Sequence, residues 1–383
     1  MNKIRVLTII DTLGYGGAER LLVSLLPELQ KQGVTCEVAV AHAPYSLMPE
    51  LEQAGIKVHC LDISHRWAIP EAAYKLANIC KQNQFDIIWG HLYFGNLYAA
   101  YTRLFIKSLK VVWTLHSTGY ALIPPVSVWQ NFRMKFEGMT AKYLVNTKVG
   151  VSNSVVNDYQ QAFGWSMHRI YNGIPIDKLP PAINIKQQLQ IRNSFGIPEK
   201  DFLITVPARY VEQKGHFVLC DALHILKVEK KWLPFCLCAS QGYLKPIIQQ
   251  RINDLELSNA IHLLDSLKQN KLFQLIQSSD AVVLPSLREP FGIAAAEAMA
   301  LKTATILTNT DGFKEVVGDS KAALLVSPNN PRELANAIWK IYTDKALREK
   351  LSQEGKKRIA ENFDIAVITA EWIKLFNNIK VRV

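Results

Sequence analysis

Two glutamates with seven residues between them form the segment Glu289-Pro290-Phe291-Gly292-Ile293-Ala294-Ala295-Ala296-Glu297. Pro290 and Gly292 keep the first turn open, and the alanine-rich stretch after them predicts the start of a helix. The exposed N–H groups and the positive dipole end of a helix start suit a phosphate. Since one carboxylate precedes the helix and the other lies inside it, hydroxyl recognition is favoured over a general acid–base pair. The alternative is a helix start with two solvated glutamates.

Two cations, Arg209 and Lys214, lie five residues apart in the loop after a predicted strand at 202–206. Cations on a loop that leaves the carboxyl end of a strand can converge on one diphosphate, because open α/β sheets bind ligands at that end. The alternative is a solvated loop without a ligand.

A glycine-rich turn, Gly14-Tyr15-Gly16-Gly17-Ala18-Glu19-Arg20, follows the first predicted strand and opens the first long helix. Glycine there lets backbone N–H groups approach an anion or a sugar. A dinucleotide fingerprint would place its third glycine at position 19, where this chain has Glu19. The oxidoreductase interpretation is therefore weakened, and a tight turn without a ligand stays open.

Two histidines follow neighbouring predicted strands. His116 follows the strand at 111–115, and His91 follows the strand at 86–89. In a parallel sheet both lie at the end where ligands bind, so both are candidate site residues. The alternative for each is a core or loop histidine.

The elements that must position these residues alternate short β-branched runs with helical periods. Strands are predicted at 5–10, 35–41, 58–61, 86–89, 111–115, 148–151, 202–206, 235–239, 260–264, 281–284, 305–307 and 323–326. Continuous apolar strands are typical of parallel sheets that are covered on both faces. Prolines interrupt the rhythm near 175–181, where we expect a linker. Two doubly wound domains result.

Composition excludes several classes of protein. The 383 residues are 49% hydrophobic and 20% charged, which is a globular balance. The six cysteines are spread and form no Cys-x-x-Cys, so neither a zinc site nor a disulfide framework is indicated. No secretory signal or membrane span is seen, and a cytoplasmic location is expected. The net charge of +11 is spread and accompanies no nucleic-acid-binding motif, which favours a polyanionic ligand or an anionic membrane surface over a nucleic acid.

Taken jointly, the motifs resemble those of retaining, nucleotide-sugar-dependent glycosyltransferases of GT-B fold, the family 4-like group 1 enzymes. Besides the segments above, the resemblance rests on Val151-Ser152, Tyr171-Asn172-Gly173-Ile174, Asp311-Gly312 with Glu315, and Leu324-Leu325-Val326 before Pro328. It implies two Rossmann-like domains facing across a cleft. The expected divisions are an acceptor-side domain at 1–173, a linker at 174–196, a donor-binding domain at 197–362, and a C-terminal helix at 363–383 that crosses back to the first domain.

The resemblance also implies roles for individual residues. The catalytic set is His116, Arg209, Lys214 and Glu289. Arg209 and Lys214 meet the donor's diphosphate, Glu297 holds the ribose, and Glu289 reads the sugar. Further residues are implied in donor binding, namely Gly16, Gly17, Phe291, Gly292 and Ile293. The acceptor side comprises Glu19, Arg20, His91 and Asn96. Two loops depart from the family pattern, Ser240-Gln241-Gly242 and Asp311-Gly312-Phe313-Lys314-Glu315.

The expected reaction is transfer of a hexose from a nucleotide diphosphate sugar, a UDP-sugar rather than a GDP-sugar, to a hydroxyl of a glycan or lipid-linked glycan in cell-surface polysaccharide synthesis. No Asp-x-Asp occurs to hold a metal, so no metal or other cofactor is expected. A nucleotide-sugar epimerase of the same architecture and a catalytically idle glycan-binding protein are the alternatives.

One aromatic and basic segment leaves two interpretations open. Trp129, Phe132 and Phe136 alternate with Arg133 and Lys135. They form either a helix packed on its own domain or an amphipathic helix at the inner face of an anionic membrane, where a lipid-linked acceptor would be presented.

Overall fold

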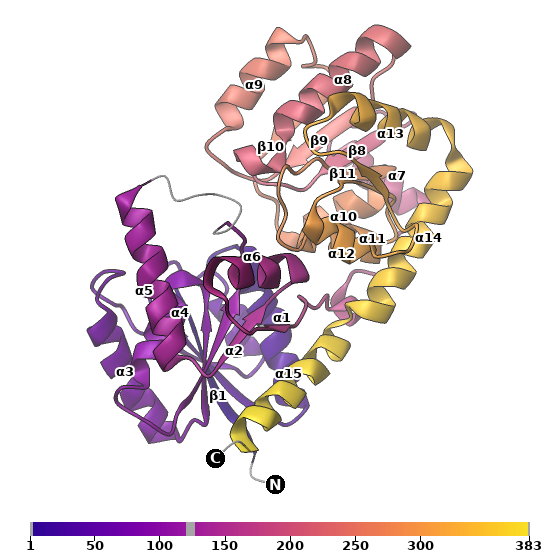
Figure 1. The fold of residues 1–383 in the computed structure, drawn as a ribbon. Helices are drawn as coiled ribbons and strands as arrows, with labels where there is room; N and C mark the ends of the chain where they lie inside the picture. The colour runs from indigo at the N-terminus through magenta and orange to yellow at the C-terminus, as the bar shows by residue number, and fades with distance from the viewer. Residues whose placement is uncertain (1–2, 120–126, 382–383) are drawn as a thin grey trace. The chain divides into compact units, whose positions relative to one another are not determined.

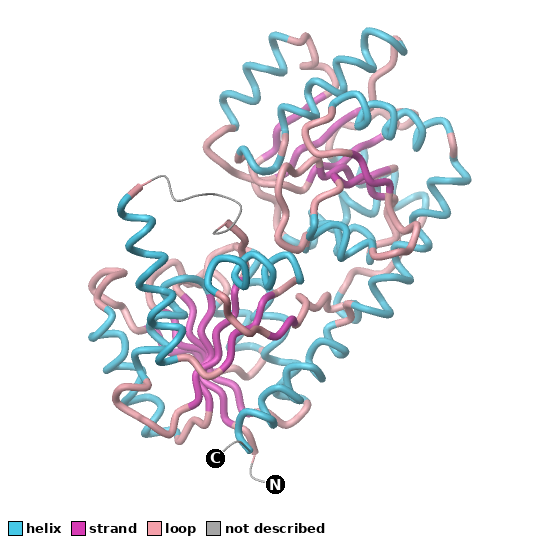
Figure 2. The backbone as a smooth tube through the Cα atoms, in the orientation of Figure 1, coloured by secondary structure: helices cyan, strands magenta, loops and turns pink. Residues whose placement is uncertain are grey.

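The computed structural model describes residues 3–119 and 127–381 and divides the chain into two units. Unit 1 comprises residues 1–173 and 365–383, and unit 2 comprises residues 174–364. Each unit is an α/β domain with one parallel sheet, as Figure 1 and Figure 2 show. The predicted pair of Rossmann-like domains is confirmed.

The sheet of unit 1 has seven strands in the order β3-β2-β1-β4-β5-β6-β7. Their bounds are β1 (Arg5–Ile10), β2 (Thr35–Val40), β3 (Lys57–Cys60), β4 (Ile87–His91), β5 (Lys110–Leu115), β6 (Thr147–Gly150) and β7 (His168–Arg169). The central strands are buried along most of their length, because helices cover both faces. The last strand, β7, was not predicted, since two residues are too few to show a period.

Unit 1 has seven helices in its described residues, of which α1, α3 and α6 are amphipathic and α4 is buried on nearly all sides. They are α1 (Gly17–Lys31), α2 (Met48–Gln53), α3 (Ile69–Asn83), α4 (Leu92–Thr102), α5 (Val128–Leu144), α6 (Asn153–Phe163) and α15 (Ile365–Val381). Ser152 caps α6 by accepting from Val155 N at 3.1 Å. The C-terminal helix α15 shares a core with α1 and the sheet through Trp372 and Phe376, so the end of the chain folds with unit 1 (Figure 1).

The sheet of unit 2 has six strands in the order β10-β9-β8-β11-β12-β13. Their bounds are β8 (Leu203–Val206), β9 (Phe235–Ala239), β10 (Ile261–Leu264), β11 (Ala281–Leu284), β12 (Thr305–Thr308) and β13 (Leu324–Val326). The helices are η1 (Ile176–Lys178), α7 (Ile185–Ser194), η2 (Glu212–Lys214), α8 (His216–Lys230), α9 (Lys245–Asp254), α10 (Gln269–Ser278), α11 (Ile293–Ala300), α12 (Asp311–Val317), α13 (Pro331–Thr343) and α14 (Lys345–Asn362).

The segment 174–196, expected as a linker, is part of unit 2. Its second half is α7, which begins with a capping box between Asn184 and Gln187. Arg192 on α7 is buried, donates through Nε to Ser278 O at 2.9 Å, and pairs with Asp280 at 2.7 Å. The prolines interrupt the helical pattern, the capping box then starts α7, and the buried Arg192 holds that helix to unit 2.

Both sheets reverse their strand order at one point. In unit 1 the chain moves outward from β1 on one side and from β4 on the other, and in unit 2 it does so from β8 and β11. The connections that leave two such strands part in opposite directions, which opens space beyond their carboxyl ends. Ligands of doubly wound sheets bind there. Among the described residues no helix is long and apolar enough to span a bilayer.

Candidate active site

In unit 2 the two strands at the reversal point carry the predicted donor-binding motifs. The connection after β8 contains Lys214, and the connection after β11 contains Glu289. Although 75 positions separate them in sequence, Lys214 Nζ donates to Glu289 Oε2 at 2.6 Å. The pairing of β8 with β11 therefore joins two of the predicted motifs in one contact.

The Lys214–Glu289 pair is held on several sides. Leu287 N donates to Gln213 O at 2.8 Å, which ties the two connections through their main chains. Ser286 Oγ donates to the same carboxylate oxygen of Glu289 at 3.3 Å. The side chains of Lys214 and Glu289 are only 16% and 12% exposed. A charge-assisted hydrogen bond with so little solvent around it holds the Lys214 and Glu289 side chains in one arrangement.

Helix α11 starts beside this pair. Its N-cap Gly292 has a φ of +106°, in the left-handed region that glycine tolerates, and Phe291 before it is buried. A Cβ on Gly312 would lie 2.3 Å from the carbonyl oxygen of Glu289, so glycine is required for α12 to approach this loop. Glu297 lies in the second turn of α11 and is partly exposed. Ile293 is the first residue of α11, so its backbone N–H has no acceptor inside the helix and can face an anion.

Arg209 does not join the Lys214–Glu289 pair. Its side chain is exposed and bonds to no residue in the described parts of the chain. The neighbouring Tyr210 is buried and donates through its hydroxyl to Cys238 O at 2.6 Å and through its N–H to Gln241 O at 3.0 Å. A Cβ on Gly242 would lie 2.3 Å from Tyr210 O, so the loop that departs from the family pattern closes directly over Tyr210.

Unit 1 has a cavity of about 270 Å³ at the carboxyl ends of β4 and β5, lined in part by the predicted His116 and Asn96. Helix α5 adds two residues that the sequence did not predict as site residues. The Arg133 guanidinium lies 4.2 Å from the centre of the Tyr93 ring, and Glu137 is buried. Arg133 and Glu137 lie four positions apart on one helix face, which was the signal available in the sequence.

His91 and His116 form a hydrogen-bonded pair in this unit. His91 Nδ1 lies 3.0 Å from His116 Nε2. Burial lowers the pKa of His116 to about 4 and lowers the pKa of the enclosed His91 well below its usual range. Both imidazoles are therefore neutral near pH 7, because burial penalises the charged form. Asn96 on α4 lines the same cavity as His116 and donates through Nδ2 to Thr114 O at 3.2 Å.

The glycine-rich turn leads into α1 at the reversal point of unit 1. Gly16 is the N-cap and Gly17 the first residue of the helix. Glu19 accepts from the Thr12 hydroxyl at 3.5 Å. Arg20 pairs with Glu50 at 2.9 Å on the surface, so the structure does not bring it together with the histidines.

Sequence reasoning missed Asp11. It directly follows β1, and Gly95 N on the neighbouring connection donates to its Oδ1 at 2.7 Å. Burial raises the pKa of Asp11 to about 6, against the opposing effects of the Gly95 amide and of Arg66. A perturbed carboxyl at a reversal point is a candidate functional group. The available signal was its position as the first residue after the first strand.

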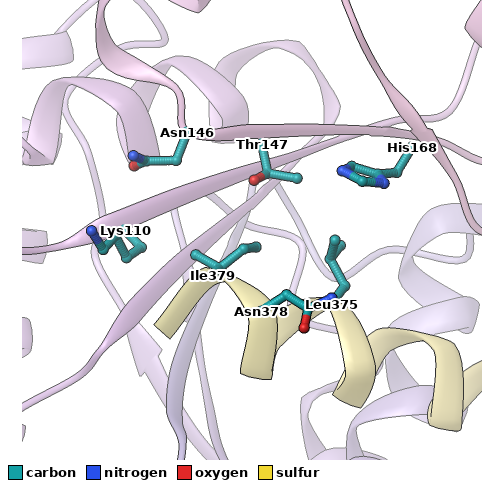
Figure 3. Close-up of a pocket in the computed structure, with 7 residues that line it drawn as sticks. All are labelled: Lys110, Asn146, Thr147, His168, Leu375, Asn378 and Ile379. Atoms are coloured by element: carbon teal, nitrogen blue, oxygen red, sulfur yellow. The ribbon is translucent and has the colours of Figure 1, made fainter. Parts of the chain in front are cut away.

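A second cavity, of about 210 Å³, lies at the opposite end of the unit 1 sheet (Figure 3). Lys110, Thr147 and His168 are the first residues of β5, β6 and β7, and α15 supplies the remaining wall with Leu375, Asn378 and Ile379. None of the predicted site residues lines it. The amino ends of parallel strands are not where doubly wound sheets bind substrates.

Known proteins share this sequence pattern and fold. The family model described as Glycosyltransferase Family 4 matches residues 15–178, and the model described as Glycosyl transferases group 1 matches residues 187–358. An uncharacterized glycosyltransferase of Methanocaldococcus jannaschii is 24% identical over 351 residues, which cover 89% of each chain. The alpha-maltose-1-phosphate synthase of Mycobacterium tuberculosis is 22% identical over 390 residues, which cover 95% of this chain and 96% of that one.

Solved structures show the same fold over the whole chain. A glycosyltransferase from Rickettsia africae superposes with a TM-score of 0.84 at 22% identity, covering 100% of both chains. The Anabaena protein HepE, crystallised with UDP and glucose, superposes with a TM-score of 0.83 at 20% identity, covering 98% of this chain and 99% of that one. With two family models that match successive halves and two sheets of the same strand order, the chain belongs to the group 1 glycosyltransferases of GT-B fold.

Proposed function

We propose that the protein is a retaining hexosyltransferase that uses a nucleotide diphosphate sugar, with UDP as the nucleotide. The observation that carries the proposal is the enclosed Lys214–Glu289 pair beside the start of α11, at the reversal point of unit 2. A cation, helix N–H groups and a carboxylate together suit a phosphate joined to a sugar. The complex of Anabaena HepE with UDP supports the choice of nucleotide.

In the proposed reaction the acceptor hydroxyl oxygen bonds to the anomeric carbon of the donor. The bond from that carbon to the diphosphate oxygen breaks, and the hydroxyl proton passes to the departing diphosphate. Negative charge develops on the diphosphate as it leaves. Lys214, the exposed Arg209 and the first amides of α11 would stabilise that charge, which is the largest effect that a preorganised site supplies.

The two carboxylates would serve different parts of the donor. Glu297 lies inside α11 and is assigned to the ribose hydroxyls, whereas Glu289 precedes the helix and is assigned to the sugar. The bond from Lys214 keeps Glu289 in place when no sugar is bound. Glu297→Ala should therefore weaken UDP binding, and Glu289→Ala should spare UDP binding while sugar transfer falls.

Cationic side chains would replace a metal ion in this site. Among residues 3–119 and 127–381 no group of three or more His, Cys, Asp or Glu side chains is placed to hold a metal. Lys214 and Arg209 supply the positive charge that a divalent cation supplies in other transferases. We therefore propose a metal-independent reaction.

Unit 1 would bind the acceptor, a glycan or lipid-linked glycan of cell-surface polysaccharide synthesis. Its cavity offers neutral donors and acceptors, His116 and Asn96, beside Arg133 and Glu137. These groups suit a polyhydroxylated ligand, because each can bond a hydroxyl. His116 is assigned a contact near the reacting centre, and Asp11 is a further polar group on the same side of the sheet.

Helix α5 supports contact with an anionic membrane on the cytoplasmic side. Trp129 and Phe132 are 64% and 48% exposed, so this stripe is not the core of unit 1. The helix also carries the exposed Lys135 and Lys142, whereas its one acid, Glu137, is buried. Exposed aromatic and basic residues on one helix fit an anionic lipid surface. Trp129→Ala with Phe132→Ala should reduce sedimentation with phosphatidylglycerol vesicles and leave UDP binding unchanged.

Calorimetric titration with UDP and GDP tests the nucleotide assignment, which requires UDP to bind more tightly than GDP. Removing a charged hydrogen-bond partner costs about 1.5–3 kcal/mol, so Glu297→Ala should weaken UDP binding by roughly ten- to a hundredfold. Equal weakening of UDP binding by Glu289→Ala would refute this division of roles between the two carboxylates. Release of UDP from a UDP-sugar with change of the sugar and no acceptor would favour the epimerase, and binding without any turnover would favour the idle protein.

A further inference from the structure

The two histidines of unit 1 share one hydrogen bond. His91 Nδ1 and His116 Nε2 lie 3.0 Å apart, and burial keeps both rings neutral near pH 7. A neutral imidazole has one N–H donor and one acceptor nitrogen. Within the pair one ring must therefore donate and the other accept, and the choice fixes the tautomer of both rings.

The surroundings of His91 distinguish the two arrangements. His91 Nε2 is enclosed and has no hydrogen-bond partner. If His116 donated, His91 Nε2 would carry a buried N–H that no acceptor receives, and enclosed N–H groups without partners are rare and costly. If His91 Nδ1 donates, Nε2 carries no proton and the enclosed atom is an unprotonated nitrogen.

The other side of the pair faces the cavity. His116 lines the cavity, and its Nδ1 bonds to no described residue and is not one of the enclosed, unpartnered atoms. When Nε2 of His116 accepts from His91, the ring proton must sit on Nδ1. His116 then presents a neutral N–H donor, which suits an oxygen of a sugar or phosphate and does not suit a proton-accepting base.

We propose that His91 is a positioning residue that donates to His116 and thereby holds His116 as the Nδ1–H tautomer, ready to donate to a ligand oxygen in the unit 1 cavity. This inference rests on the proposed function only for the identity of that ligand. It assigns His91 no contact with the substrate.

The fold holds His91 rigidly for this task. His91 ends β4 and is the N-cap of α4, and the Trp89 ring centre lies 4.5 Å from its own. Trp89 Nε1 in turn donates to Thr114 Oγ1 at 2.7 Å. A Cβ at Gly90 would lie 2.7 Å from the Cα of Asn96, so the turn into α4 allows only glycine there. The end of β4, the start of α4 and the Trp89 ring together restrain the His91 side chain.

Nitrogen NMR of the free full-length protein labelled with 15N-histidine tests the tautomer directly, with His116→Phe used to assign the signals. We expect His116 as the Nδ1–H tautomer in the wild type and in His91→Asn, whose amide nitrogen can replace Nδ1 as donor. At a pH where the introduced carboxylate is ionised, His91→Asp offers only acceptor oxygens and should place a proton on Nε2 of His116. An Nε2–H tautomer of His116 in the wild type would overturn the proposal.

Turnover of UDP-glucose provides a second readout. His91→Phe should lower kcat/KM by about the same factor as His116→Phe, and the double variant should be no worse than His116→Phe alone, because His91 acts through His116. His91→Asn should recover most of the activity that His91→Phe loses. Independent, multiplying losses would refute a positioning role. Since the NMR experiment needs no substrate, a wild type that turns over no UDP-sugar would contradict the proposed function and leave the tautomer result to decide this inference.

Discussion

Removal of one partner from the Lys214–Glu289 pair should destabilise unit 2 more than removal of both. The pair lies at 2.6 Å with both side chains mostly buried. At an effective dielectric constant of about 20, the attraction at this distance is roughly 6 kcal/mol before the cost of desolvation is subtracted. Breaking a buried pair costs about 3–5 kcal/mol when the remaining charge has no other partner. Because Ser286 still donates to Glu289, we expect about 2–3 kcal/mol for Lys214→Met.

Glu289→Gln keeps the shape of the side chain and removes its charge. Alone it should cost about 1–3 kcal/mol, since Lys214 then faces a neutral amide. The double variant Lys214→Met, Glu289→Gln should unfold within about 1 kcal/mol of the wild type, because no uncompensated buried charge remains. UDP affinity should fall in Lys214→Met and stay low in the double variant, since the cation that meets the diphosphate is absent from both.

Urea unfolding of the four proteins gives the stability cycle, and calorimetry with UDP gives the binding cycle. Lys227→Met is the matched control, because Lys227 pairs with Glu256 on the surface of the same unit, and its stability should stay close to that of the wild type. Stability losses that add within about 0.5 kcal/mol would show that the two charges do not interact. Recovery of UDP binding in the double variant would remove Lys214 from the donor site.

Three further outcomes are expected. Gly312→Ala should cost about 1–3 kcal/mol in urea unfolding and weaken UDP binding, because the added Cβ would lie 2.3 Å from Glu289 O, whereas Gly14→Ala, with 3.4 Å to Pro44, should be tolerated. EDTA should leave UDP affinity and turnover unchanged, and recovery of lost activity by magnesium or manganese would contradict metal independence. Burial lowers the pKa of His116 from 6.5 to about 4, so the unfolded chain binds more protons than the folded chain between those pH values. The difference in unfolding free energy between the wild type and His116→Phe should therefore fall by up to roughly 3 kcal/mol as the pH drops from 6.5 to 4. Asp11, whose pKa is raised to about 6, acts in the opposite direction in both proteins and cancels in the difference. His116 also lowers the pKa of His91, so the loss of His116 changes this difference in the same direction, and a flat difference would show that His116 is protonated as easily folded as unfolded.

The positions of the strands along the chain could be predicted from the sequence, because buried parallel strands are continuous apolar runs. The predictions of 5–10, 235–239 and 281–284 coincide with β1, β9 and β11, and the other predicted strands differ from the observed ones by one or two residues at one or both ends. The residues that follow those strands could be chosen as site candidates for the same reason. The sequence did not predict that 174–196 folds with unit 2, because the role of Arg192 in joining α7 to Ser278 depends on a contact 86 positions away.

The pairs that define the chemistry could not be predicted, because each depends on which strands lie side by side. Lys214 meets Glu289 only because β11 lies next to β8, and Gly95 reaches Asp11 only because β4 lies next to β1. Neither adjacency follows from sequence order. Burial then decides ionisation: it raises the pKa of Asp11 against the opposing effect of the Gly95 amide, and it keeps His91 and His116 neutral. A residue's type and its place after a strand therefore select candidate site residues, whereas the strand order in the sheet decides which of them form hydrogen bonds and ion pairs with one another.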